Sequence, residues 1–414
     1  SLANLYMKLG DFEKAEQLYL ESKTIREIVL GKEHPEYATS LDNLAILYKK
    51  EGKKKKAEQL YVESKTIREN VLGKEHPEYA SSLNNLAILY EESSNYKEAE
   101  RFYLESKVIR EKILGKEHLD YISILKNLAS FYEVQKRFIE SNQLLMEFYT
   151  LEQVMLAKGT TFLSERELNN YISIFKQNGD DLGKYLISRY SNNTPFGILA
   201  SIGYNHVLFH KGFILASSIK LNVNASQYPL EYEINCKLKS CRRQIAFEYS
   251  KPKINGVRLA ELEEKSSALE KELINNLAGY GEAIRQLKWQ EVRNQLELKD
   301  AAIEFIHFKF NDKNQTDSFM YAALVILPND TTPHFVPLFE EKKLNQLLLN
   351  SQSRRMDYVA EVYRFANDKS DTLSIDQNRS LYELIWKPLE PYLKGVNKIY
   401  FSPSGLLHRI NQNA

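Results

Sequence analysis

The sequence has few cysteines, almost no net charge and no long apolar run. Its 414 residues include only two cysteines, Cys236 and Cys241, which are too few for a disulfide framework and fit a reducing compartment. The 56 basic and 55 acidic residues leave a net charge of +1, so no global field favours nucleic acid or an anionic membrane surface as a partner. No apolar run approaches the roughly 18 residues that a membrane-spanning helix needs. We therefore expect a cytoplasmic protein.

What the sequence does contain is a segment that repeats almost unchanged every 42 residues. It reads LGKEHPEYATSLDNLAILYKK at 30–50, LGKEHPEYASSLNNLAILYEE at 72–92 and LGKEHLDYISILKNLASFYEV at 114–134. A fixed period of this length predicts stacked units that bury their apolar faces against each other. In the same register Ala3 takes the position of Ala45, so the chain is expected to begin inside a helix.

Each unit is predicted to be a pair of helices. Apolar residues recur at helical spacing from Leu41 to Tyr48, and Gly52 then interrupts the pattern. A second helix is predicted from about Lys54 until Gly73. Small and large apolar residues alternate along both helices, which is the pattern that lets two antiparallel helices pack closely.

These residues carry a resemblance to a known family. The pattern N-L-A-x-L-Y-x(3)-G-x(4)-A-E-x-L-Y runs from Asn43 to Tyr61 and returns from Asn85 to Tyr103, and it resembles tetratricopeptide repeats (TPRs). The 42-residue period with its L-G-x-x-H-P connector resembles the kinesin-light-chain subgroup. The copies cover 1–118, and a decayed copy covers about 119–158. The resemblance implies an all-α solenoid over residues 1–158 that binds a protein or peptide partner.

The candidate binding residues are three asparagines that recur at the repeat period: Asn43, Asn85 and Asn127. In the TPR family the matching position faces the concave groove, where an amide can donate to and accept from a peptide backbone. Lys49 and Asn84 are predicted on the same face, and with the asparagines they form the predicted peptide-binding set. The alternative is that the asparagines cap or bridge neighbouring helices.

A basic pattern also repeats on the second helix of each unit. It pairs a lysine with an arginine three residues later and a glutamate after that, at Lys23/Arg26, Lys65/Arg68 and Lys107/Arg110. One interpretation is a basic ridge that recruits an acidic peptide. The other, which we favour, is a solvated face with intrahelical ion pairs.

From about residue 163 the period is lost although helical patterning continues. We predict a helical connector over 159–285, with a break at 195–197 where Pro-Phe-Gly occurs. The charged amphipathic stretch at 258–277 has leucines at three- and four-residue spacing. It is predicted to be one long helix that pairs with another in an antiparallel hairpin.

The last part, 286–414, has the pattern of an α/β domain. Strands are predicted at 303–308, 321–327, 334–338 and 397–402, and helices at 340–349, 356–366 and 379–393. Strands that alternate with helices predict a sheet covered on its faces.

Three segments of this part, at 289–308, 319–341 and 381–410, resemble the opening portion of a CHAT domain. CHAT domains are caspase-like modules often found behind TPRs in bacteria. The resemblance implies a cysteine–histidine dyad in which a thiolate attacks a peptide carbonyl. In the family both dyad residues follow the segment that here reads YFSPSGLLHRI, so this truncated α/β part is expected to contain no catalytic residue.

Two other features give no site. His408 precedes the region of the family's catalytic histidine and is predicted to brace a loop. Cys236 and Cys241 have no histidine pair nearby and are predicted to be ordinary thiols, so no metal site and no cofactor are expected. The leading hypothesis is a TPR–CHAT protein whose residues 1–414 bind a polypeptide without cleaving it. The alternative is a non-catalytic interaction scaffold.

Overall fold

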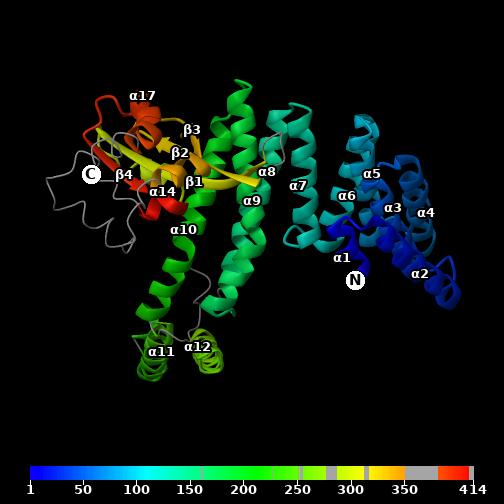
Figure 1. The fold of residues 1–414 in the computed structure, drawn as a ribbon, viewed down its shortest axis with the longest axis horizontal. Coiled ribbons are helices and arrows are strands. Elements are labelled where there is room, and N and C mark those ends of the chain that lie inside the picture. The colour runs from blue at the N-terminus through cyan, green and yellow to red at the C-terminus, as the bar shows by residue number, and fades with distance from the viewer. Residues whose placement is uncertain are drawn as a thin grey trace. The chain divides into compact units, whose positions relative to one another are not determined.

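The chain folds into two compact units, Ser1–Leu151 and Glu152–Ala414. The sequence-based boundary after residue 158 lies slightly later, and the predicted connector shares the second unit with the sheet. The computed structural model (Figure 1) describes residues 1–159, 162–226, 228–249, 251, 255–276, 287–311, 317–349 and 381–409.

The first unit is a row of helices joined by short turns (Figure 1). Consecutive helices pack against each other from α1 to α7, and α8 continues into the second unit. The predicted hairpin with its second helix beginning at Lys54 is confirmed by α3 and α4. The helices are α1 (Leu2–Leu9), α2 (Phe12–Leu30), α3 (Pro35–Lys50), α4 (Lys54–Leu72), α5 (Pro77–Glu92), α6 (Tyr96–Leu114), α7 (Leu119–Val134) and α8 (Phe138–Gly159).

The repeated connector determines where the first helix of each unit begins. Its glycine has a left-handed backbone that a residue with a Cβ rarely adopts, with φ of 84° at Gly31, 85° at Gly73 and 81° at Gly115. Its histidine is the N-cap, and its Nδ1 accepts a hydrogen bond of 3.1 Å from the backbone N–H two residues later, at His34, His76 and His118. The L-G-x-x-H motif is therefore a helix-capping device.

Alanines at the helix contacts allow the two helices of a unit to pack closely. Ala45 and Ala57 are completely buried, and the Tyr61 side chain fills the adjacent space at 2% exposure. In the decayed fourth copy Ser141 stands at the alanine position, and its hydroxyl donates to Glu133 at 2.7 Å. The buried hydroxyl thus has a partner on α7.

The second unit begins with the end of α8, which four long helices follow. The break predicted at 195–197 separates α9 from α10, and the predicted hairpin is confirmed by α11 and α12, which pack together. Among the described residues, no helix is both long and apolar enough to cross a membrane. The elements are α9 (Glu165–Ser191), α10 (Gly197–Ala225), α11 (Pro229–Tyr249), α12 (Gly256–Asn276), α13 (Trp289–Arg293), α14 (Glu341–Leu349), η2 (Lys387–Leu389), α17 (Glu390–Leu393) and η3 (Gly405–Arg409).

The sheet has four strands in the order β3-β2-β1-β4. The central strand β1 (Asp300–Asn311) pairs antiparallel with β2 (Asp317–Ile326) and parallel with β4 (Lys398–Ser402). Strand β3 (His334–Glu340) pairs antiparallel with β2. All four predicted strands are confirmed. The predicted helix at 340–349 is confirmed by α14, whereas the one at 356–366 lies outside the described residues.

Helices cover both faces of the sheet (Figure 1). On one face α9 and α10 pack on the strands, and a Cβ at Gly183 would lie 2.3 Å from the Phe308 ring, so only glycine fits there. On the other face Phe305 and Tyr321 pack with Leu344 of α14 in one buried cluster. The predicted α/β arrangement with a covered sheet is confirmed.

Candidate functional site

A tyrosine–glutamate hydrogen bond joins each repeat to the preceding one. The hydroxyl of the tyrosine on the first helix donates to the glutamate of the A-E pair, at 2.6 Å for Tyr48 to Glu16, 2.8 Å for Tyr90 to Glu58 and 2.9 Å for Tyr132 to Glu100. The bond to Glu16, together with burial, raises the pKa of Tyr48 to about 12. Burial and the bond to Glu58 raise the pKa of Tyr90 to about 12. These tyrosines and glutamates therefore hold neighbouring repeats together.

The repeated arginine is buried where it was predicted to be solvated. Arg68 is only 4% exposed, and Arg110 is similar at 5%. The Arg68 Nη1 donates to Asp42 Oδ2 at 2.5 Å and to Ser82 Oγ at 2.6 Å. Its Nε donates to Glu78 at 3.2 Å. The expectation of a solvated face was wrong for these two arginines, because both lie inside the stack. Partners on α3 and α5 bind the Arg68 guanidinium, whereas Arg110 donates to a carbonyl of α7 and a serine of α5.

The lysine of the same pattern does form intrahelical ion pairs. Each pairs with the glutamate four residues later, at 3.8 Å for Lys23, 2.9 Å for Lys65 and 3.5 Å for Lys107. All three side chains are partly exposed, so each pair contributes only a few tenths of a kcal/mol, roughly. The lysines and arginines together do not present a continuous basic ridge.

The predicted peptide-binding residues lie on the first helices α3, α5 and α7, and all are partly exposed. The Asn127 amide donates to Asn84 Oδ1 at 2.9 Å, which links α7 to α5. Lys49 pairs with Glu92 at 2.7 Å. Among the described residues, the side chains of Asn43 and Asn85 make no hydrogen bond, so their amides keep their donors and acceptors for other partners.

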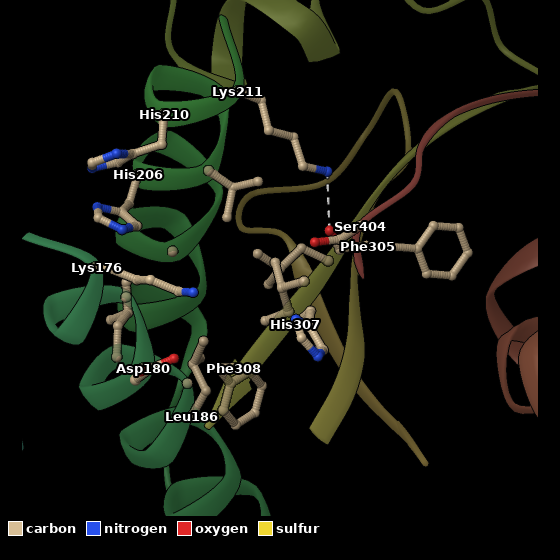
Figure 2. Close-up of a pocket in the computed structure, with 17 residues that line it drawn as sticks. Lys176, Asp180, Leu186, His206, His210, Lys211, Phe305, His307, Phe308 and Ser404 are labelled. Carbon is tan, nitrogen blue, oxygen red and sulfur yellow. Dashed lines mark hydrogen bonds between the residues drawn. The ribbon is translucent and has the colours of Figure 1, made fainter. Parts of the chain in front are cut away.

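The second unit contains a cavity of about 190 Å³ between α9, α10 and the sheet (Figure 2). Its polar lining includes Lys176, Asp180, His307 and Ser404. The Asp180 carboxylate accepts from a backbone N–H of β1 at 2.8 Å, and His307 Nε2 lies 2.7 Å from a carboxylate of α14. Burial lowers the pKa of His307, although that carboxylate opposes the shift.

Lys211 lines the same cavity, but its ammonium group donates its hydrogen bonds to the sheet. Its Nζ donates to Glu304 Oε2 at 2.7 Å and to the carbonyls of Phe305 and Ser402 at 3.0 and 3.1 Å. Burial lowers the pKa of Lys211, and Glu304 opposes that shift. The three bonds tie α10 to β1 and β4, so this lysine holds the sheet to its covering helix.

On the side of α10 opposite Lys211, two histidines lie next to a carboxylate of α8. Figure 2 shows the imidazoles of His206 and His210 on one side of α10, whereas Lys211 extends toward the sheet. The Glu152 side chain is fully buried, and its Oε1 lies 3.1 Å from His210 Nε2 and 3.6 Å from His206 Nδ1. Burial and the neighbouring His210 hold the pKa of His206 well below its usual range.

This cluster is absent from the sequence-based prediction, which considered only the cysteines as metal ligands. The available signal is the spacing of His206 and His210, because residues four apart lie on the same face of a helix. Glu152 carries no such signal, since it is one acidic residue in a long helix that precedes His206 by more than fifty positions. Only the fold brings the three together.

The remaining candidates occupy ordinary positions. Cys236 and Cys241 are both free thiols on α11, the first exposed and the second buried. The Cys241 thiol donates to the carbonyl of Leu262 at 3.2 Å, which joins α11 to α12. His408 is exposed on η3.

Comparison with known proteins identifies the repeats. A family model described as tetratricopeptide repeat matches residues 1–70 and 56–112. A comparison with curated proteins found no match. Among solved structures, BtubC (BKLC) from P. vanneervenii is 27% identical with a TM-score of 0.34, and the match covers 37% of this chain and 60% of that one.

A putative kinesin light chain from Podosopora anserina with nearly identical TPR-like repeats is 26% identical with a TM-score of 0.33. That match covers 36% of this chain and 72% of the other. The family match covers the segment in which the capping histidines, alanine contacts and tyrosine–glutamate bonds recur. Residues 1–112 are tetratricopeptide repeats, the kind of unit that serves as a scaffold for protein–protein interaction.

Proposed function

We propose that the repeats bind an extended polypeptide along α3, α5 and α7. The observation that carries this proposal is that Asn43 and Asn85 recur at one position of the repeat and that, among the described residues, their side chains make no hydrogen bond. The residues that hold the repeats together are others, namely the buried arginines and the tyrosine–glutamate pairs. A recurring amide that makes no hydrogen bond to a neighbouring repeat keeps its donors and its acceptor for a ligand.

The side-chain amide suits a peptide backbone. It offers donors and an acceptor at once, and a backbone peptide group presents the complementary pair. The bond from Asn127 to Asn84 orients one amide of this row before any ligand arrives, which reduces the entropy cost of binding. The partly exposed pair of Lys49 and Glu92 adds charges of both signs beside the row, so a peptide of mixed composition fits better than a phosphate.

The test uses the full chain and a peptide selected against it from a random-sequence library. Replacing Asn43 and Asn85 by alanine is expected to weaken that peptide's affinity about 10-fold, because two hydrogen bonds of about 0.5–1 kcal/mol each are lost. Adding Asn127→Ala should weaken it further, and this third change also removes the bond to Asn84. Fluorescence anisotropy measures the dissociation constants.

The matched control replaces three exposed amides on the second helices, Gln17, Gln59 and Asn70, by alanine. This variant should bind the peptide within about 2-fold of the parent chain, because surface changes remote from the ligand cost little. Circular dichroism shows whether the Asn43/Asn85 variant is folded. If it is folded and binds the peptide as tightly as the control does, the assignment of the binding surface is wrong.

For the second unit we propose the caspase-like role that its CHAT resemblance implies, with peptide binding alone in residues 1–414. The support is that all four predicted strands belong to one mixed sheet. Both cysteines lie on α11, away from the strands in the sequence, so no residue is proposed as a nucleophile. Mass spectrometry of the selected peptide after incubation with the chain should find it intact. The two free thiols support a cytoplasmic location.

A further inference from the structure

We infer that Glu152, His206 and His210 form a binding site for one divalent transition-metal ion of the Zn²⁺ type. The ligand atoms of these residues all lie within 4.8 Å of one another. Glu152 is completely buried and His206 is 8% exposed, so the three groups converge in the interior of the second unit. Two imidazoles and one carboxylate are a ligand set that proteins use for such ions.

Two of the three separations between the ligand atoms are close to those around a metal ion. Atoms bound to a tetrahedral Zn²⁺ lie about 3.3 Å apart, because Zn–N and Zn–O bonds are about 2.0–2.1 Å long. Glu152 Oε1 is 3.1 Å from His210 Nε2 and 3.6 Å from His206 Nδ1. The two imidazole nitrogens lie within 4.8 Å of each other, so the histidine side chains must rotate for one ion to reach all three atoms.

Three helices hold the ligands in place. His206 and His210 are one turn apart on α10, and their ring centroids are 4.2 Å from each other. On α9 the Asn178 amide donates to the second oxygen of Glu152, which leaves Oε1 directed at the imidazoles. The adjacent Gly179 makes room for the ring, because a Cβ there would lie 3.1 Å from His206 Nε2. Such outer contacts orient the ligands of metal sites.

The charge of the cluster also favours a cation. A fully buried carboxylate is costly unless a positive group neutralises it. A divalent ion neutralises Glu152 and leaves both imidazoles neutral, which is the form that binds metals. The competing arrangement is a direct hydrogen bond between His210 and Glu152 with no metal. Two nitrogen ligands select Zn²⁺, Co²⁺ or Ni²⁺ over Mg²⁺ and Ca²⁺, which prefer oxygen.

The experiment measures Zn²⁺ binding to the full, tag-free chain after treatment with a chelator. Calorimetry in competition with a weak chelator should find one tight site, and Co²⁺ at the same site should give the visible absorption of a four- or five-coordinate ion. His210→Asn and, separately, Glu152→Gln should each abolish the tight site. Asn178→Ala should weaken it about 10–100-fold, as losses of outer-shell contacts do.

The matched control is His334→Asn. His334 Nε2 also lies 3.0 Å from a carboxylate, that of Asp330, but it has no second histidine beside it in the described part of the chain. This variant should keep the tight site. The inference is overturned if the parent chain binds no Zn²⁺ or Co²⁺ tightly, or if Glu152→Gln, which keeps the shape of the side chain, binds them as well as His334→Asn does. The latter result would place bound ions on other groups.

Discussion

Replacing Arg68 by leucine should destabilise the α3–α5 region far more than an ordinary surface change. The Arg68 side chain is 5% exposed and that of Asp42 is 10% exposed, and their charged atoms are 2.5 Å apart. The same guanidinium also donates to Ser82 and Glu78. Leucine removes the cation and leaves the Asp42 carboxylate buried without a charged partner. Breaking one side of a buried pair costs about 3–5 kcal/mol.

Arg101 provides the matched control within the same stack. It is also an arginine on a second helix and pairs with Glu98 at 2.6 Å, but its side chain is 56% exposed. Because water and salt screen an exposed pair, Arg101→Leu should cost at most about 1 kcal/mol. The difference between the two substitutions measures the effect of burial and not of arginine chemistry.

Hydrogen exchange followed by mass spectrometry is the assay, because a repeat stack opens locally and one global free energy does not describe it. Peptides from α3 to α5 should exchange about 100-fold faster or more in Arg68→Leu, since each 1.4 kcal/mol of lost stability is a factor of about ten. Arg101→Leu should change exchange by less than about 10-fold.

The pH dependence gives a second check. Burial raises the pKa of Asp42, and Arg68 opposes that shift, so losing Arg68 raises the pKa further. A folded-state pKa above the unfolded value means that the folded variant binds the proton first as pH falls. The stability that Arg68→Leu loses relative to the parent chain should therefore become smaller below neutral pH. Two results would show that a buried unpaired charge is not the cause of the lost stability. One is a loss of stability under about 1 kcal/mol in Arg68→Leu, and the other is a loss of stability that grows as pH falls.

Two further predictions concern packing and alkaline stability. Gly183→Ala should lower the free energy of unfolding by about 1–3 kcal/mol in thermal melts, because its Cβ would meet the Phe308 ring, whereas Gly212→Ala, with open space around it, should be neutral or slightly stabilising. The pKa values of Tyr48 and Tyr90 are raised to about 12, so the folded repeats should lose stability as pH rises from about 10 to 12. Urea unfolding should show a smaller alkaline loss in the Tyr48→Phe/Tyr90→Phe variant, and an equal loss would exclude these hydroxyls as its source.

Local patterns in the sequence predicted the elements well. Strand β1 follows from the alternation at 303–308, and the helices of the repeats follow from the spacing between Leu41 and Tyr48. These signals suffice because an element's type depends on neighbours within a few residues. The parallel pairing of β1 with β4 joins strands that lie almost ninety residues apart, so no local pattern contains it.

Buried polar groups are where sequence reasoning failed. The pattern around Arg68 is typical of an exposed helix face, and its burial depends on Asp42 and Ser82 from two other helices. The same holds for Glu152, which becomes recognisable only beside His206 and His210. Charged residues are usually predicted to be exposed. This prediction is wrong wherever the fold brings several polar or oppositely charged side chains around one charged group.

The repeats are also less equivalent than their sequences indicate. Asn84 stands where Asp42 stands in the preceding unit, so Arg110 has no carboxylate at the position that neutralises Arg68. Arg110 instead donates to the carbonyl of Asp120 and to a serine hydroxyl, and its Nε has no partner in the described structure. Burial accordingly lowers the pKa of Arg110. Because position 84 is an asparagine, its Oδ1 can accept from Asn127 on the proposed binding face. The replacement of aspartate by asparagine therefore removes an ion pair inside the stack and orients an amide on the binding face.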